Sequence, residues 1–210
     1  MWKSLLNFSG KTVGRALGAA LLATALTACG GGEPAAGPVP AQGVVRLSDQ
    51  FTGKFALIDM NGQHVTNDDF KGKVLIVYFG FATCPDVCPM ALSRLSAALN
   101  ELTEKELAKL VPVFITVDPE RDTPEALKAY LGFNKRILGL TGSQADIDAA
   151  RDAFKVYARR RPLPESALGY TMDHSSLFYI VDPSGQPTLA LEDTLTPEEI
   201  ATMLRRSIRG

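Results

Sequence analysis

Residues 73–89 read KVLIVYFGFATCPDVCP and combine the two features that decide the fold. The first half is continuously apolar and rich in β-branched and aromatic residues, which is typical of a strand buried on both faces. The second half carries two thiols, Cys84 and Cys88, each followed by a proline. Proline disfavours helical backbone in the residue before it but suits the first turn of a helix, so Pro89 predicts that a helix begins here. We therefore expect paired thiols at the turn between a buried strand and a helix.

Cys84 and Cys88 must act on each other or on a shared third atom. The chain has three cysteines, and the third, Cys29, lies in what we interpret as a processing signal. A pair of soft thiolates indicates either a redox-active couple, able to close a disulfide, or a soft-metal site. Because Cys88 lies at the start of the expected helix, we expect the helix dipole to lower the pKa of its thiol.

From Phe51 onward the chain alternates strand and helix patterns. The pair Asn61-Gly62 predicts the turn of a β-hairpin. The other expected elements are strands at 112–117, 137–140, 176–181 and 187–191, and helices at 89–110, 123–133, 145–158 and 196–209. We expect residues 159–169 to form a loop, and the helix before it to bury Ile147, Ala150, Phe154 and Tyr157. This order resembles an α/β thioredoxin-like fold with an N-terminal β-hairpin extension and an inserted strand and helix.

The first 28 residues have the composition of a signal peptide. They carry three basic residues and no acidic one, and their apolar stretch, 16–28, is too short to span a bilayer. The stretch ends in LTACG, which resembles the lipobox of bacterial lipoproteins, so we expect Cys29 to carry a lipid. Residues 29–49 are then a flexible tether and residues 50–210 the folded domain. This organisation predicts a protein anchored at the periplasmic side of a bacterial membrane.

The charge pattern argues against a nucleic-acid partner. The chain has 22 Lys and Arg residues against 23 Asp and Glu residues. The best basic run, residues 159–161, is only three residues long, so we interpret it as a solvated patch, with a partner surface as the less favoured alternative. The chain beyond residue 28 is long enough for one domain with a sizeable core.

A third ligand would separate metal binding from simple electron exchange. The chain offers two histidines, His64 and His174. His64 follows the Asn-Gly turn, and we expect it to be an exposed hairpin residue. His174 lies immediately before the expected strand 176–181, which in a thioredoxin-like sheet runs beside the thiol-bearing strand. Its position alone leaves open whether His174 is a ligand or a structural residue.

Three separated motifs together resemble the SCO/SenC family of membrane-tethered copper proteins. They are GFATCPDVCP at 80–89, VDPERDTP at 117–124 and DHS at 173–175, and the resemblance covers about residues 50–206. It implies that Cys84, Cys88 and His174 bind one copper ion, as Cu(I) or Cu(II). It also implies a metallochaperone, rather than an enzyme, that serves the binuclear copper centre of cytochrome c oxidase.

The resemblance implies partners as well. These are the copper-bearing subunit of the oxidase or another copper chaperone, a thiol reductant protein, and the membrane. Because oxidation of the thiols removes both sulfur ligands, we expect copper loading to follow the thiol state. Asp173 is a candidate to orient or tune the site from outside the ligand set, with an exposed turn acid as the alternative. Met172 shares the face of His174, and we favour a gap-filling role for it over ligation by its thioether.

The main alternative is a periplasmic thiol-disulfide oxidoreductase that reduces the acceptor's cysteines. Against it, the thiol spacing is CxxxC rather than CxxC, and residues 165–181 lack the proline that such enzymes place opposite their thiols. A peroxiredoxin-like peroxidase would need a PxxxTxxC arrangement, which is absent. A lipid-tethered binding module with an incidental disulfide is the remaining alternative. To the motif at 118–124 we assign only a structural role, that of capping a helix and fixing a turn.

Overall fold

The computed structural model describes residues 42–209. The expected signal peptide, the expected lipid-bearing Cys29 and most of the expected tether lie outside these residues. Within them no helix is long and apolar enough to cross a membrane. The strands are β1 Val44–Arg46, β2 Ala56–Asp59, β3 His64–Thr66, β4 Val74–Gly80, β5 Leu110–Thr116, β6 Leu138–Thr141, β7 Ala158–Pro162, β8 Tyr170–His174, β9 Leu177–Val181 and β10 Pro187–Glu192. The helices are α1 Val87–Asn100, α2 Glu104–Leu107, α3 Pro124–Tyr130, α4 Gln144–Phe154 and α5 Pro197–Arg209.

Eight of the strands form one mixed sheet in the order β1-β10-β9-β4-β5-β6-β2-β3. β4 lies inside this sheet, parallel to β5 and antiparallel to β9, and all its residues are buried. Successive side chains of a strand face opposite sides. Accordingly Tyr78 packs on Phe178, whereas Phe79 packs on Phe154 of α4. The expected hairpin extension is present as β2 and β3, which join the sheet beside β6.

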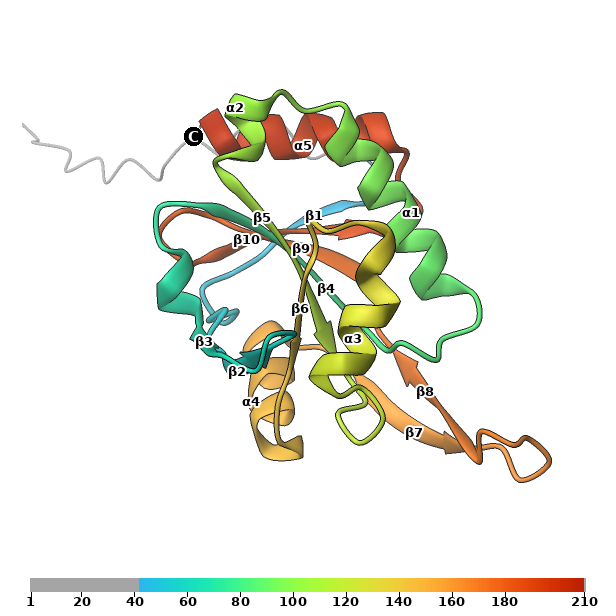
Figure 1. The fold of residues 1–210 in the computed structure, drawn as a ribbon. Coiled ribbons are helices and arrows are strands. Elements are labelled where there is room, and N and C mark those ends of the chain that lie inside the picture. Colours follow the sequence, from blue (N-terminus) through green and yellow to red (C-terminus); the bar gives the residue numbers. More distant parts are fainter. Residues whose placement is uncertain (1–41, 210) are drawn as a thin grey trace, which may run out of the picture. The chain divides into compact units, whose positions relative to one another are not determined.

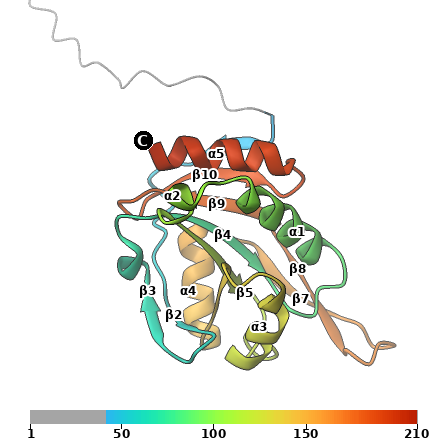
Figure 2. The same ribbon diagram turned by 45° about the horizontal axis from the view of Figure 1, so that its top comes forward.

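The helices cover both faces of the sheet (Figures 1 and 2). α1 and α3 lie on one face together with α5, and α4 lies on the other. α1 and α3 each connect neighbouring parallel strands in the same direction across the sheet, and the right-handed rule for such crossovers puts them on one face. The turn with the thiols leaves the sheet at the carboxyl end of β4, beside the beginning of β9.

Three expected boundaries are wrong. The helix expected at 145–158 ends at Phe154, where Lys155 caps it with left-handed backbone. The helix expected at 89–110 is interrupted, because Thr103 starts a separate helix through a capping box: its hydroxyl accepts from the Glu106 N–H, and the Glu106 carboxylate accepts from the Thr103 N–H. The tether expected to reach residue 49 ends earlier. Residues 44–46 are β1, which pairs with β10 at the edge of the sheet.

The segment expected to be a loop is a β-hairpin. β7 and β8 pair antiparallel as a separate two-stranded sheet, with Ala158 opposite His174, and Figure 1 shows this hairpin extending away from the main sheet. The hairpin was missed because β7 contains three consecutive exposed arginines and has no apolar alternation. Tyr157 precedes it and is 56% exposed, so its expected burial is wrong. The other three residues expected to be buried on that helix are fully buried.

Candidate metal centre

The two thiols lie where β4 passes into α1. The Cys84 N–H donates to the Phe81 carbonyl at 3.2 Å, which closes a turn directly after the strand. α1 begins at Val87, so Cys88 lies in its first turn. The Cys88 N–H points back to the Cys84 sulfur, with 3.5 Å between the nitrogen and Sγ. Cys88 is fully buried and Cys84 is 9% exposed, so Cys84 is the sulfur nearer to solvent.

Gly80 makes room for the buried sulfur. A Cβ atom at this position would lie 3.0 Å from Cys88 Sγ and 2.9 Å from a ring carbon of Phe114. Both distances are too short for a carbon atom, so any side chain here would displace the thiol or the ring. Sequence reasoning did not single out Gly80. Its place at the end of an apolar strand, beside the thiol turn, is the available signal of a close approach.

His174 reaches the thiols from the end of β8. Its Nε2 lies 3.4 Å from Cys88 Sγ, and its Nδ1 lies 2.9 Å from the Ser175 carbonyl oxygen. Because a carbonyl oxygen only accepts hydrogen bonds, Nδ1 carries a proton, and Nε2 is the ring nitrogen that faces the thiols. The edge-to-face contact between the imidazole and the Phe81 ring holds its orientation.

The three side chains converge on one point. The ligand atoms of Cys84, Cys88 and His174 all lie within 4.8 Å of one another, and no other such group occurs among residues 42–209. A groove of about 310 Å³ over the site is lined by residues of both the thiol turn and β8. Two sulfurs and one imidazole nitrogen suit a copper or zinc ion and disfavour hard cations such as Mg²⁺. The residues present therefore fit a soft-metal site with one side open to an incoming ligand.

The two thiols differ in their ionisation. A hydrogen bond from the Cys88 thiol lowers the pKa of Cys84 to about 4, with smaller contributions from His174 and from the backbone N–H groups of Asp86 and Cys88. The same sulfur–sulfur interaction and burial raise the pKa of Cys88. Cys84 is thus the thiolate and Cys88 the thiol of the pair. Both are free cysteines in this structure.

The expectation that the helix start ionises Cys88 is therefore wrong. The amide groups at the beginning of α1 are directed at the neighbouring sulfur, Cys84, and contribute to the lowering of its pKa. Cys88 itself is packed against Gly80 and Tyr78 inside the protein, where burial disfavours a charge. The physical effect predicted from the helix start is present but acts on the other thiol.

The remaining residues singled out from the sequence lie around or away from this centre. The Asp173 carboxylate accepts from Arg161 Nε at 3.0 Å, while the ring nitrogen of His174 faces a backbone carbonyl; a tuning role for Asp173 stays a prediction. Met172 packs against the core and lines the groove, in line with the gap-filling role. His64 is exposed on β3, as expected.

A hydrogen-bonded chain behind Cys88 was not anticipated. The Tyr78 hydroxyl lies 2.7 Å from Ser176 Oγ, and the Ser176 hydroxyl donates to the Asp193 carboxylate at 2.6 Å. Tyr78 is fully buried, and this burial raises the pKa of its hydroxyl well above the usual value for tyrosine. These residues come from three distant parts of the sequence and no motif joins them, so only the folded chain reveals the connection.

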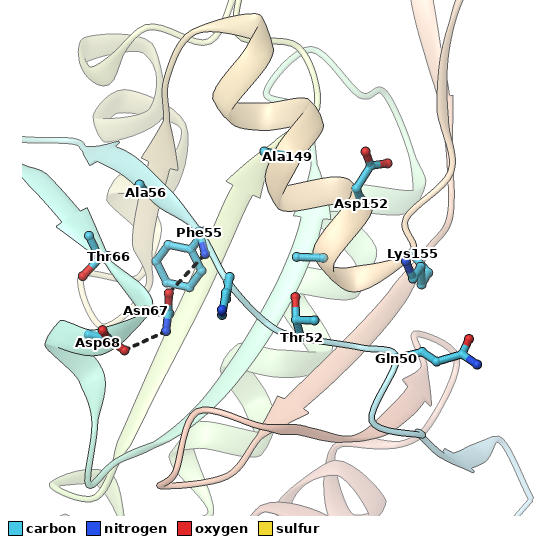
Figure 3. Close-up of a pocket in the computed structure, with 12 residues that line it drawn as sticks. Gln50, Thr52, Phe55, Ala56, Thr66, Asn67, Asp68, Ala149, Asp152 and Lys155 are labelled. Carbon is cyan, nitrogen blue, oxygen red and sulfur yellow. Dashed lines mark hydrogen bonds between the residues drawn. The ribbon is translucent and has the colours of Figure 1, made fainter.

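A wider cavity of about 620 Å³ lies elsewhere, between the segment before β2 and helix α4 (Figure 3). Asn67 makes two hydrogen bonds in its wall: the side-chain carbonyl accepts from the Phe55 N–H, and the side-chain amide donates to Asp68. Positively charged lysines and negatively charged aspartates both line this cavity, and none of its lining residues is a cysteine or histidine. It is therefore separate from the metal centre in both position and chemistry.

Comparison with known proteins agrees with this geometry. The SCO1/SenC family model matches residues 45–209. An SCO2-like protein of Rickettsia felis is 39% identical over 154 residues, which are 73% of this chain and 75% of that protein. The mitochondrial protein SCO2 of Saccharomyces cerevisiae is 44% identical over 135 residues, which are 64% of this chain and 45% of that protein.

Solved structures of SCO proteins also match this chain. The copper-bound ScoI of Bradyrhizobium japonicum matches with a TM-score of 0.69 at 39% identity, covering 75% of this chain and 99% of that one. Yeast Sco1 with copper bound matches with a TM-score of 0.70 at 38% identity, covering 77% and 90% of the two chains. These neighbours confirm the thioredoxin-like fold expected from the sequence. With its sheet order, its convergent cysteines and histidine, and a family match over nearly all of the described residues, the chain belongs to the SCO1/SenC family.

Proposed function

We propose that this protein is a membrane-tethered copper chaperone that helps deliver copper to the binuclear copper centre of cytochrome c oxidase. It binds one ion through Cys84, Cys88 and His174. The observation that carries the proposal is the convergence of these three donor atoms within 4.8 Å in a chain of the SCO1/SenC family. The matched structures of ScoI and Sco1 with copper bound support copper as the ion.

The donor set excludes a closed structural zinc site, because such sites usually have four protein ligands and this centre offers three. Two cysteines and one histidine with an open position also occur at catalytic zinc sites, so the preference for copper rests on the copper-bound ScoI and Sco1 structures. Three donors that include two thiolates suit Cu(I). The open groove gives a ligand of the acceptor protein access to the ion, so copper can pass by ligand exchange without release to solution. The proposed acceptor is the copper-bearing subunit of the oxidase or another copper chaperone.

Copper loading in this proposal requires reduced thiols. A disulfide between Cys84 and Cys88 would remove both anionic sulfur donors. A thiol reductant protein would restore them by exchanging its own dithiol for this disulfide. The proximity of the two sulfurs, one ionised and one protonated, supports this coupling between thiol state and metal binding.

The proposal includes a lipid anchor at Cys29 and a location at the periplasmic side of a bacterial membrane. It rests on the signal-like composition of residues 1–28 and on the lipobox-like sequence around Cys29. Growth with a fatty acid that carries a chemical tag should label the wild-type protein and leave Cys29→Ala unlabelled. Equal labelling of the two proteins would contradict the anchor.

Copper binding by variants tests the ligand set. The reduced protein is loaded with Cu(I) without oxygen, and its affinity is measured by competition with a chromogenic chelator. We expect one copper per chain, an affinity loss of about tenfold or more in His174→Ala, and no change in the matched control His64→Ala, whose ring is exposed on β3. Wild-type affinity in His174→Ala would refute the ligand set.

The alternative function is reduction of the acceptor's cysteines. The observation that favours it is the thiolate of Cys84 beside the protonated thiol of Cys88, an arrangement suited to attack on a disulfide and resolution of the mixed disulfide. His174→Ala separates the two functions, because it removes a metal ligand and leaves both thiols. If the variant still supports assembly of the oxidase copper centre at the wild-type rate, reduction is the function; if assembly fails, copper delivery is.

A further inference from the structure

The geometry points to a clamp that holds the two halves of the metal centre together: the turn formed by residues 117–123, between β5 and α3. One arm of this clamp, Asp122, fixes the thiol turn, and the other, Asp118, fixes the hairpin that carries His174. Asp118, Asp122 and Tyr170 are then positioning residues for the metal centre. The proposal rests on the ligand set of the proposed function and adds to it residues that touch no metal.

The need for such a device follows from the sheet arrangement. Cys84 and Cys88 follow β4 of the main sheet, whereas His174 ends β8 of a separate two-stranded sheet. Backbone ladders fix distances only within one sheet, so no ladder hydrogen bond sets the position of β8 relative to the thiol turn. The two residues between His174 and β9 hold this end of β8 near the main sheet, and contacts between side chains must hold the rest of the hairpin.

The first arm joins the clamp to the thiol turn. Asp122 is almost completely buried, and its Oδ2 accepts from the Ala82 N–H at 3.0 Å and from the Thr116 hydroxyl at 2.6 Å. Ala82 lies two residues before Cys84, while Thr116 ends β5. A buried carboxylate with these two donors ties the beginning of the thiol turn to the end of the neighbouring strand.

The second arm joins the clamp to the hairpin. The Tyr170 hydroxyl donates to Asp118 Oδ1 at 2.8 Å, and Asp118 Oδ2 accepts from Arg121 Nε. Arg121 Nη1 also donates to the Tyr170 backbone carbonyl at 3.1 Å. Tyr170 is thus bonded to the clamp through both its side chain and its backbone, and it is the first residue of β8.

The ring of Tyr170 is contacted by two arginines. The guanidinium carbons of Arg121 and Arg160 lie 3.8 and 3.9 Å from the ring centroid. Two guanidinium groups cannot occupy one face of a ring at this height, so each takes its own face. Arg160 in turn pairs with Glu120 of the clamp. β7, through Arg160, and β8, through Tyr170, are therefore both attached to the same turn.

The fixed end of β8 determines where its other end lies. Tyr170 and His174 are four residues apart on one strand, which spans about 13 Å and keeps both side chains on the same face. Beyond His174, the Ser175 N–H donates to the Tyr157 carbonyl at 2.9 Å. Release of Tyr170 would leave this contact, the pairing with β7, the short link to β9 and the contact with the Phe81 ring as the restraints on His174.

Hydrogen exchange in the reduced, metal-free protein tests the clamp without copper. The reporters are the Ser175 N–H beside His174 and the Cys84 N–H in the thiol turn, both hydrogen-bonded to carbonyls. Tyr170→Phe removes one hydrogen bond to a carboxylate and keeps the ring, so we expect exchange at Ser175 to accelerate about tenfold or more and exchange at Cys84 to stay unchanged. Tyr157→Phe is the matched control, because it removes an exposed hydroxyl and should change neither.

Asp122→Asn should give the opposite pattern. A neutral amide oxygen accepts hydrogen bonds more weakly than a carboxylate does. We therefore expect hydrogen exchange at the Cys84 N–H to accelerate roughly threefold to tenfold, while the exchange rate at the Ser175 N–H stays unchanged. Acceleration of both reporters in both variants would mean general destabilisation and would overturn the clamp. An unchanged exchange rate at Ser175 in Tyr170→Phe would also overturn the clamp.

A double-mutant cycle on copper affinity separates this proposal from the proposed function. If Tyr170 acts through His174, Tyr170→Phe weakens copper binding several-fold in the wild-type background and has no effect in His174→Ala. An equal loss in both backgrounds overturns the clamp. If His174→Ala alone leaves the affinity unchanged, the ligand set of the proposed function fails, and the exchange experiment still decides whether the clamp exists.

Discussion

Cys84 should react with iodoacetamide at a rate that hardly changes between pH 6 and 8. Only the thiolate is nucleophilic. The hydrogen bond from the Cys88 thiol lowers the pKa of Cys84 from 9.0 to about 4. Its thiolate fraction is then already about 99% at pH 6, so the rate changes less than about 1.5-fold up to pH 8. A thiol with an unperturbed pKa gains about a hundredfold in thiolate, and hence in rate, over the same range.

The shape of the profile is the informative quantity, rather than the absolute rate. A thiolate of low pKa is also a weaker nucleophile, with a Brønsted slope of about 0.4 to 0.5. At pH 7 the gain in ionised fraction and the loss in reactivity therefore cancel to within a few-fold. Restricted access to Cys84, which is 9% exposed, slows the reaction equally at every pH. The rate should fall only below about pH 4, where the thiolate becomes protonated.

The assay is alkylation of the reduced, metal-free protein, quenched at short times and mapped to individual cysteines by peptide mass spectrometry. Cys88→Ala is the informative variant, because it removes the donor that lowers the pKa of Cys84 most. Its profile should shift to higher pH. A wild-type rate at Cys84 that rises about tenfold per pH unit from 6 to 8 would refute the assignment of the thiolate to this sulfur.

Three further outcomes follow from the packing. Gly80→Ala should destabilise the protein by about 1 to 3 kcal/mol in urea denaturation, because its Cβ would meet Cys88 Sγ at 3.0 Å; unchanged stability would mean that the site relaxes freely. Phe154→Ala should cost about 3 to 5 kcal/mol by the same assay, since this ring is fully buried against Phe79, and a loss below about 1 kcal/mol would contradict its place in the core. Met172→Leu should retain the copper affinity measured by chelator competition, as expected of a gap-filling side chain; a tenfold loss would instead assign the thioether to the ion.

Local sequence patterns predicted an element correctly where that element is determined by its own residues. The apolar run before the thiols became β4, buried along its whole length. The pair Thr123-Pro124 became the cap and first residue of α3, with the Thr123 hydroxyl accepting from the Ala126 N–H. Each of these outcomes is decided within a few residues, by backbone preference and by the period of burial.

Patterns failed where a polar segment is stabilised by distant partners. β7 has no apolar alternation, and it is held by its pairing with β8 and by contacts of Arg160 with Tyr170 and Glu120. The motif at 118–124 predicts a helix cap and a turn, and the structure contains the cap. Its second role, contact with the thiol turn and the hairpin together, depends on residues up to 52 positions away.

The sequence by itself determined the central strand, the turn that carries two thiols, and the kinds of donor atom available to a metal. Strand period, proline geometry and cysteine number can be read from neighbouring residues, without knowing which distant residues each segment contacts in the fold. Only the tertiary structure decided that His174 lies 3.4 Å from a sulfur 86 positions earlier in the chain, and that Cys84 rather than Cys88 is the thiolate. Ligand convergence and pKa depend on burial and on neighbours brought together by folding, and no sequence spacing contains either of them.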